Sequence, residues 1–221
     1  GYTDEVTRFT YGNPYPFSWG EVLSLSHLYS VPLRLPGTTS GSVSAGLSDT
    51  RPVSALAQGP LAPRISPPQQ LTVEGTAAQA DRTLGSLTPR VTWKAPLLGT
   101  PSAYRLRISR LSAEDTRTFA TTVATLSTKE TSIDVFPGLL QPGQKYAFTL
   151  VSYLTPGLDL SVHPYGIQVR TDVASAHTVS SILSTPAALT PGQTAPPLSP
   201  AIALPDDRLE LRKTMHNRST R

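Results

Sequence analysis

The sequence contains no cysteine, and this absence removes several kinds of chemistry at once. Disulfide bonds, thiolate metal sites and cysteine nucleophiles all need a thiol. An extracellular location stays open, because secreted bacterial proteins do not need disulfides. Charged residues are also scarce: they form 15% of the 221 residues, against roughly 25% in typical globular chains.

Long apolar runs and long basic runs are absent as well. No stretch approaches the ~20 apolar residues that span a bilayer, so we expect no membrane span. The net charge is +4, but the 19 Lys and Arg residues are scattered and do not alternate with aromatic residues. This pattern does not predict nucleic-acid binding. The chain begins at Gly1 without a leader, and we interpret it as a fragment or a mature portion.

The histidines do not form a recognisable metal motif. They are His27, His163, His177 and His216. Only His163 has a carboxylate at a ligand spacing, Asp159, and nearby prolines disfavour the helix that this spacing requires. We therefore predict no metal site and no cofactor.

Motifs of the common hydrolases and phosphate-binding proteins are also missing. The adjacent acidic pairs are Asp4-Glu5, Glu114-Asp115 and Asp206-Asp207. Neighbouring residues on a strand point to opposite faces, whereas a glycosidase needs two carboxylates about 5–10 Å apart in one cleft. The chain has no Gly-x-Ser-x-Gly elbow and no glycine-rich phosphate loop. We predict that the protein is not an enzyme.

Proline is abundant, with 22 residues, and its distribution divides the chain into four regions. Residues 1–36 form an aromatic, β-rich arm, or the end of a truncated β-domain. Residues 37–63 are rich in small residues and are interpreted as a linker, with one candidate strand at 41–47. Residues 64–174 form a folded module. Residues 175–221 form a proline-rich tail that we expect to be disordered.

Apolar and polar residues alternate repeatedly in the module, with turn residues between the runs. This period of two is typical of half-buried strands. The expected strands are 70–74, 90–94, 104–109, 119–126, 133–135, 145–150 and 165–170. No amphipathic helix is indicated. The sequence therefore predicts an all-β fold, a sandwich of seven short strands.

One turn carries a more specific signal. Leu140-Gln-Pro-Gly-Gln-Lys-Tyr146 leads into the strand that contains Phe148 and Leu150. A tyrosine that enters a strand after such a turn is typical of a tyrosine corner. Its ring packs in the core, and its hydroxyl bonds to the backbone a few residues upstream.

With this corner, the module resembles a fibronectin type III domain over about half of the chain. Pro67-Pro68, Val91-Thr-Trp93-Lys-Ala-Pro96 and Tyr104-Arg-Leu106-Arg-Ile108 resemble the first three strands of that family. The resemblance implies a seven-stranded immunoglobulin-like sandwich and an extracellular or cell-envelope location of the bacterial type. It also implies a core position for Trp93. The module has no Arg-Gly-Asp triplet, so integrin adhesion is not implied.

The function that we expect is therefore that of a non-enzymatic spacer and protein-contact module, whose partner is a protein or a cell surface. The candidate contact residues are Tyr11, Tyr15, Phe17 and Trp19, which crowd a proline-bearing loop. These rings could instead fill the core of a truncated domain or pack on the sandwich. The alternative function is an accessory carbohydrate-binding unit of a larger secreted enzyme, with a polysaccharide as its ligand.

Overall fold

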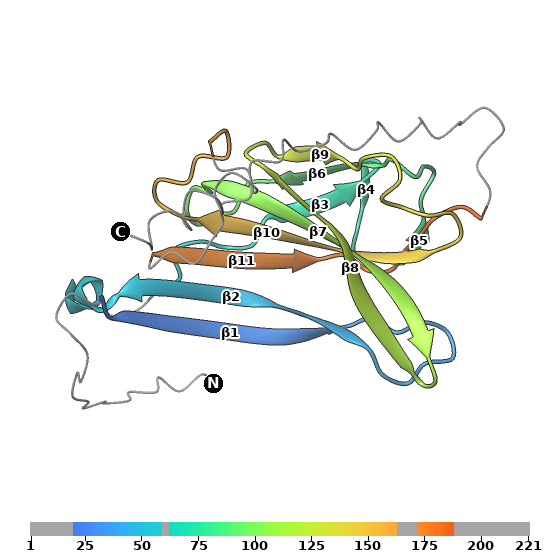
Figure 1. Cartoon of the computed structure of the whole chain (residues 1–221), viewed down its shortest axis with the longest axis horizontal. Coiled ribbons are helices and arrows are strands. Elements are labelled where there is room, and N and C mark those ends of the chain that lie inside the picture. The colour runs from blue at the N-terminus through green and yellow to red at the C-terminus, as the bar shows by residue number, and fades with distance from the viewer. Residues whose placement is uncertain (1–19, 59–61, 163–171, 188–221) are drawn as a thin grey trace, which may run out of the picture.

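The computed structural model of the 221-residue chain describes residues 20–58, 62–162 and 172–187. Strands dominate these ranges, and the one helical element in them is a short 3-10 helix, η1, at Val53–Gln58. The strands form two sheets in a sandwich-like arrangement (Figure 1). The prediction of an all-β fold is confirmed.

The larger sheet has eight strands, which run in the order β1-β2-β11-β10-β12-β5, with β7 beside β10 and β8 beside β7. Their bounds are β1 Val22–Pro32, β2 Ser42–Pro52, β5 Arg82–Thr83, β7 Ala103–Glu114, β8 Arg117–Thr128, β10 Lys145–Leu154, β11 Val173–Val179 and β12 Leu183–Ser184. The short pair of β12 with β5 is parallel, and the other pairs in this sheet are antiparallel.

The smaller sheet has four strands in the order β4-β3-β6-β9. Their bounds are β3 Gln69–Val73, β4 Thr76–Ala77, β6 Arg90–Lys94 and β9 Ser132–Asp134. This sheet packs on the central part of the larger one. It leaves the hairpin of β1 and β2 as an extension at one side, which forms the lower edge of the view in Figure 1.

The main core lies between the two sheets and follows the predicted alternation. Tyr146 and Phe148 of β10 are fully buried in it. Trp93 of β6 is 5% exposed, and its ring meets Tyr104 of β7 edge-on, with 5.3 Å between the ring centroids. The backbone N–H of Gln141 donates a hydrogen bond to the Tyr146 hydroxyl at 2.8 Å. The core position of Trp93 and the tyrosine corner are therefore both confirmed.

Six of the strands predicted for the module overlap β3, β6, β7, β8, β9 and β10, whereas the seventh, at 165–170, lies outside the described residues. The structure places β11 next to β10. The interpretation of 175–221 as a disordered tail is therefore wrong for residues 175–187, which contain most of β11 and all of β12. The sequence of β11 is Val-Ala-Ser-Ala-His-Thr-Val, and it lacks the large apolar residues at every second position that mark a half-buried strand.

The interpretation of residues 37–63 as a linker is wrong for Ser42–Pro52, although the candidate strand at 41–47 overlaps the beginning of this range. These residues form β2, which pairs with β1 along its whole length and with β11 over four residues. Small residues are sufficient to form a strand here, because β2 lies between β1 and β11 and pairs with both through its backbone. The arm and the sandwich thus share one sheet.

The turn between β1 and β2 contacts a second hairpin, β7–β8. A β-bridge joins Ser40 to Arg117, and the N–H of Leu35 donates to the Thr118 hydroxyl at 2.9 Å. Leu33 and Leu35 are buried there in a small apolar cluster with Leu111. The tips of the two hairpins therefore meet, as the right-hand side of Figure 1 shows.

Candidate functional site

A cavity of about 300 Å³ lies beside the hairpin. Its walls come from three parts of the chain: the paired strands β1 and β2, residues 62–65, and the beginning of β11. The apolar part of the lining includes Leu25, Leu47, Pro63, Ile65 and Ala174. We refer to it as the hairpin pocket.

Strand register explains why these side chains gather. Leu25 lies opposite Asp49, and Asp49 in turn lies opposite Ala174 of β11, so the three share one face of the sheet. Ile65 is 1% exposed and packs there against Ala174 and its neighbour on the same face, Ala176. The small alanine side chains leave room for the cavity.

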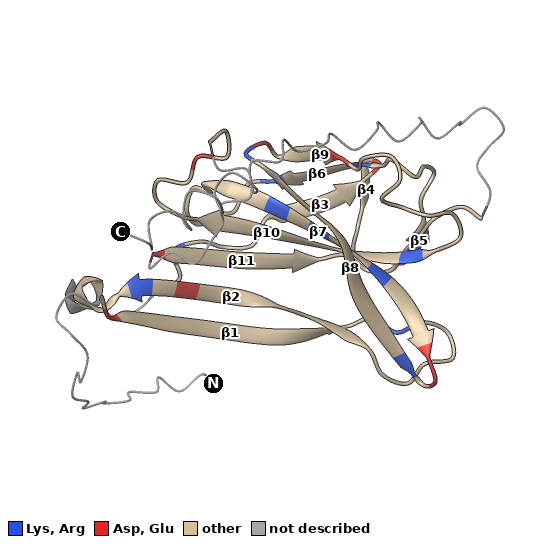
Figure 2. Cartoon of the chain, viewed as in Figure 1, with Lys and Arg blue, Asp and Glu red and all other residues tan. Residues whose placement is uncertain are grey.

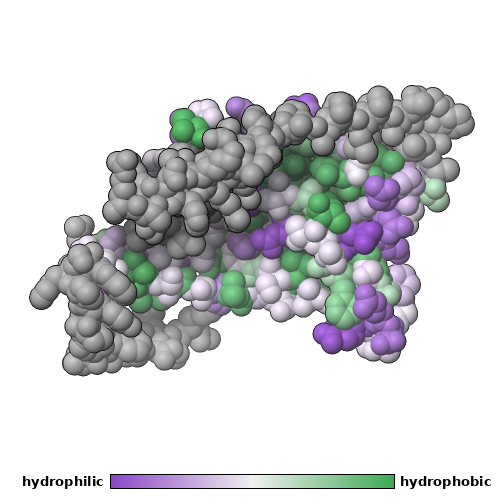
Figure 3. Space-filling view, viewed as in Figure 1, coloured by the Kyte–Doolittle hydropathy of each residue, from purple (hydrophilic) through white to green (hydrophobic). Residues whose placement is uncertain are grey.

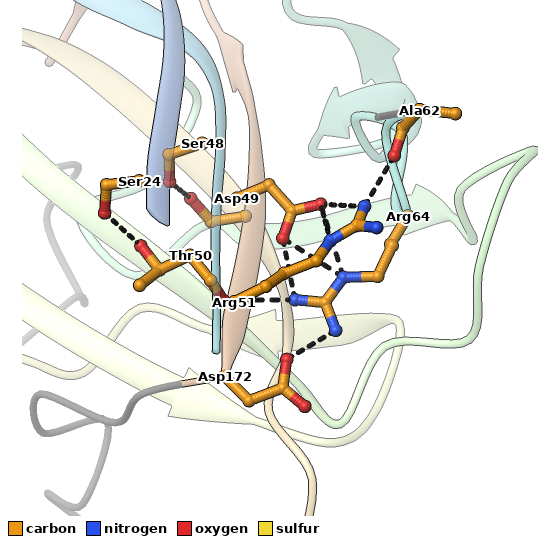
Figure 4. Close-up of polar contacts among 9 residues, drawn as sticks. Ser24, Ser48, Asp49, Thr50, Arg51, Ala62, Arg64 and Asp172 are labelled. Carbon is orange, nitrogen blue, oxygen red and sulfur yellow. Dashed lines mark hydrogen bonds and ion pairs between the residues drawn. The ribbon is translucent and has the colours of Figure 1, made fainter. Parts of the chain in front are cut away.

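Three charged side chains, those of Asp49, Arg51 and Arg64, belong to the lining of the hairpin pocket, and Figure 4 shows their contacts. Arg51 approaches Asp49 with 2.5 Å between Nη2 and Oδ2. Arg64 lies 2.7 Å from the other oxygen of Asp49 and, through Nη1, 2.5 Å from Asp172 Oδ1. Arg51 also donates to the carbonyl of Ala62 at 2.6 Å. Two guanidinium groups and two carboxylates thus balance in charge.

Asp49 is ionised at neutral pH. Its burial acts to raise the pKa of the carboxyl, but the hydrogen bonds and charges of Arg51 and Arg64 outweigh this effect. The pKa of Asp49 therefore lies below its ordinary value of 3.8. Burial opposes the charge on Arg64 as well, yet the bonds to Asp49 and Asp172 raise its pKa. The ionised forms of Asp49 and Arg64 are therefore favoured by their mutual contact.

The cluster holds together segments that are distant in sequence. Asp49 and Arg51 belong to β2, Arg64 lies in the segment that leads to the smaller sheet, and Asp172 immediately precedes β11. A further hydrogen bond joins the hydroxyls of Ser48 and Ser175 at 2.8 Å. We call Asp49, Arg51, Arg64 and Asp172 the hairpin clamp, because they fix the hairpin to the sandwich.

The four aromatic residues predicted to make contacts, Tyr11, Tyr15, Phe17 and Trp19, lie outside the described residues. Their role stays a prediction.

The two described histidines, His27 and His177, belong to different strands of the larger sheet. His27 lines the hairpin pocket, whereas His177 is in β11, where burial and the charge of Arg107 lower its pKa. His163 and His216 fall outside the described ranges. Across residues 20–58, 62–162 and 172–187, no three His, Asp or Glu side chains meet in an arrangement that could hold a metal ion.

Sequence reasoning did not find the hairpin clamp. One local signal was present, because the spacing of Asp49 and Arg51 puts a carboxylate and a guanidinium on the same face of a strand. Arg64 and Asp172 gave no such signal, since 108 positions separate them.

Comparison of the chain with protein-family models, with curated proteins and with solved structures gave no match. In the part of the chain that the structure describes, no helix is both long and apolar enough to cross a membrane. The fold and the hairpin pocket are therefore the basis for a functional proposal.

Proposed function

We propose that this protein is a non-enzymatic structural and interaction module of the extracellular space or the cell envelope, acting as a spacer and as a contact surface for another protein. The observation that carries this proposal is the hairpin clamp. Its charges pair with one another across three chain segments, beside a cavity whose other walls are mostly apolar. Such a site offers a partner protein a shaped, mostly apolar surface to contact.

The pairing in the hairpin clamp argues against catalysis there. A catalyst needs polar groups aimed at the atoms of a substrate that gain or lose charge. Both oxygens of Asp49 instead accept hydrogen bonds from guanidinium groups of the protein itself. Ionisation of this carboxylate is favoured by the same bonds, so its pKa is far from that of a general base or acid at neutral pH.

The fibronectin type III assignment belongs to this proposal. It is supported by two sheets that enclose one core and by the tyrosine corner at the entry to β10. The core contact of Trp93 with Tyr104 is also in keeping with it. Modules of this type commonly serve as spacers or contact units, and the extracellular or envelope location follows from the same resemblance.

Selection of peptide ligands from a random display library, with the full chain immobilised, tests the proposal. We expect selected peptides to bind the parent protein and to lose about tenfold or more in affinity with Leu25→Asp, which places a charge at the 43%-exposed rim of the pocket. The control is Phe136→Asp, because Phe136 is 58% exposed next to β9 in the other sheet. This variant should bind like the parent.

Two results would overturn the proposal. The first is turnover of an ester, peptide or glycoside substrate that Asp49→Asn abolishes while the protein remains folded. The second is saturable binding of a soluble glycan that is lost in Trp19→Ala, which would favour the carbohydrate-binding alternative.

A further inference from the structure

Strand β1 forms an edge of the larger sheet, and one side of its backbone is unpaired among the described residues. The ends of its ladder with β2 show which side this is. Val53 N–H donates to the carbonyl of Glu21, and Leu33 N–H donates to that of Gly41. Odd-numbered residues of β1 therefore bond to β2, because bonding alternates along an antiparallel pair. The N–H groups of even-numbered residues, such as Ser24 and Ser26, point outward.

This edge lacks the features by which proteins usually prevent edge-to-edge pairing, namely inserted charges, bulges and short length. It is 11 residues long, its register with β2 runs without a shift, and it contains no Asp, Glu, Lys or Arg. In Figure 2, β1 is tan along its length, whereas β2 carries both charge colours. Pro32 is at the far end and on an outward position, where it removes a single donor.

Apolar side chains accompany the unpaired backbone. Leu25 is 43% exposed, Leu28 64% and Tyr29 47%. In Figure 3, white and green residues cover the visible part of the lower layer, and purple residues gather at the right, where the hairpin tips meet. A partner at this edge would thus gain both backbone hydrogen bonds and apolar contacts.

The other long edge strand, β8, is a weaker candidate. Ser40 already bridges Arg117 at its beginning, and its register with β7 shifts between Ile108 and Ser109. Five of its 12 residues are threonines. The free backbone of β8 is therefore shorter and less regular than that of β1.

The sequence of β1 is nearly symmetrical in polarity about His27. If a second β1 lies antiparallel with His27 opposite His27, Leu23 faces Val31 and Leu25 faces Tyr29. On the other face, Ser24 meets Ser30. In this register the outward-pointing even residues pair with each other, as the hydrogen-bonding pattern requires. All 11 residues of the strand take part.

We propose that β1 pairs with β1 of a second copy of this chain, so that the two larger sheets join into one across a twofold axis at His27. The inference rests on the proposed function, because it names a partner for the interaction module. No charged side chain within either strand opposes the contact. A single strand pair is a small interface, so the dimer is expected to be weak and dependent on concentration.

Sedimentation velocity of the full chain over a range of concentrations measures this association. The parent should show a reversible monomer–dimer equilibrium in the micromolar range. His27→Lys and His27→Glu should each weaken it by about tenfold or more, because like charges would face each other at the axis. An equimolar mixture of the two variants should restore a dimer, since an ammonium group and a carboxylate then face each other across the axis.

A second variant and a control complete the test. Ser26→Pro removes an outward N–H that makes no bond to β2, so it should weaken the dimer while the thermal transition persists. Phe136→Lys adds the same charge as His27→Lys at a distant exposed site, and it should dimerise like the parent.

Three outcomes would overturn the proposal. They are a parent chain that remains monomeric at every concentration, a dimer that both His27 variants leave unchanged, and a mixture that shows no more dimer than its components. Selected peptides that still depend on Leu25 would then leave the proposed contact function intact, so the two failures are distinguishable.

Discussion

Tyr146 and Asp49 show how single side chains determine the stability of this protein. The hydroxyl of Tyr146 is fully buried and accepts the backbone N–H of Gln141, which fixes the turn before β10. Asp49 accepts hydrogen bonds from two guanidinium groups at the junction of hairpin and sandwich. In both cases one polar group accepts hydrogen bonds that join separate parts of the chain.

The variant Tyr146→Phe tests the corner. Removal of the hydroxyl leaves the Gln141 N–H without its partner, which should lower the free energy of unfolding by about 1–3 kcal/mol. Urea denaturation measures this change. Tyr29→Phe is the matched control, because it removes the same hydroxyl from a tyrosine that is 47% exposed on β1. An equal loss in both variants would contradict the role of the corner.

Asp49 should make the stability depend on pH. Its pKa in the folded state is lower than its ordinary value, so the folded protein binds fewer protons than the unfolded chain near that pH. The contribution of Asp49 is therefore complete above pH ~4 and is lost as the pH falls through the lower, folded pKa. Urea midpoints measured between neutral pH and acid should decline less steeply in Asp49→Asn than in the parent.

The control for this experiment is Asp134→Asn. The Asp134 side chain is 64% exposed in its pair with Arg90, and solvent screens such a pair. Its midpoints should follow those of the parent. If the urea midpoints of Asp49→Asn and of the parent declined in parallel with falling pH, the hairpin clamp would not contribute to folding in the way that its geometry indicates.

At the scale of elements, the β1–β2 hairpin depends on a close approach of two backbones. A Cβ atom built on Gly46 would lie 2.1 Å from the carbonyl oxygen of His27. That atom belongs to the neighbouring strand and cannot move aside as a flexible side chain can. Glycine is therefore required at this position, and the small residues of β2 serve strand pairing.

The variant Gly46→Val should disrupt the hairpin selectively. We expect a loss of about 1–3 kcal/mol, since the added side chain forces the strands apart. Hydrogen exchange should become faster in β1 and β2, while β6 and β10 remain protected. Gly20→Val is the control, because a Cβ there meets no atom within 4 Å. Unchanged exchange in β1 and β2 would show that the strands do not pack as closely as described.

At the scale of the whole molecule, the sandwich needs residues beyond the module predicted from sequence. β11 pairs with β10 on one side and β2 on the other, and Ala176 and Leu183 are fully buried. A chain that ends at residue 174 should lose its cooperative thermal transition. Strand β10 would lose its pairing with β11, and the main core would lose Leu183. A chain that ends at residue 187 should retain the transition. Melting of the shorter chain within a few degrees of the full one would contradict this.

The elements that sequence predicted well are those whose neighbours impose a pattern. β6, β7 and β10 each have one face in the main core, so apolar residues recur at every second position. The corner was predictable because Pro142, Gly143 and Tyr146 act within one short segment. A feature that depends on residues close together in the chain can therefore be recognised from the sequence.

The elements that sequence missed, or found only in part, depend on distant partners: β11 lies mostly in the predicted tail, and the candidate strand at 41–47 covers only the beginning of β2. β2 and β11 contain mostly small or polar residues, and their strand conformation comes from pairing with each other and with β1 and β10. The hairpin clamp depends even more on distant partners, since Arg64 bonds to Asp49 and Asp172, which lie in two other segments of the chain. Periodicity along the chain cannot report which strands will become neighbours.

The position of β1 at the edge also has a mechanical consequence. In Figure 1 the blue beginning of β1 lies at one end of the long axis, and the orange end of the described chain lies at the other. Tension between Gly20 and Ala187 would therefore pull β1 along its own axis, against β2. The hydrogen bonds of that ladder would share the load and slide together, instead of opening one after another from the end. A hairpin attached in this way resists extension in shear, the direction in which a β-ladder is strongest.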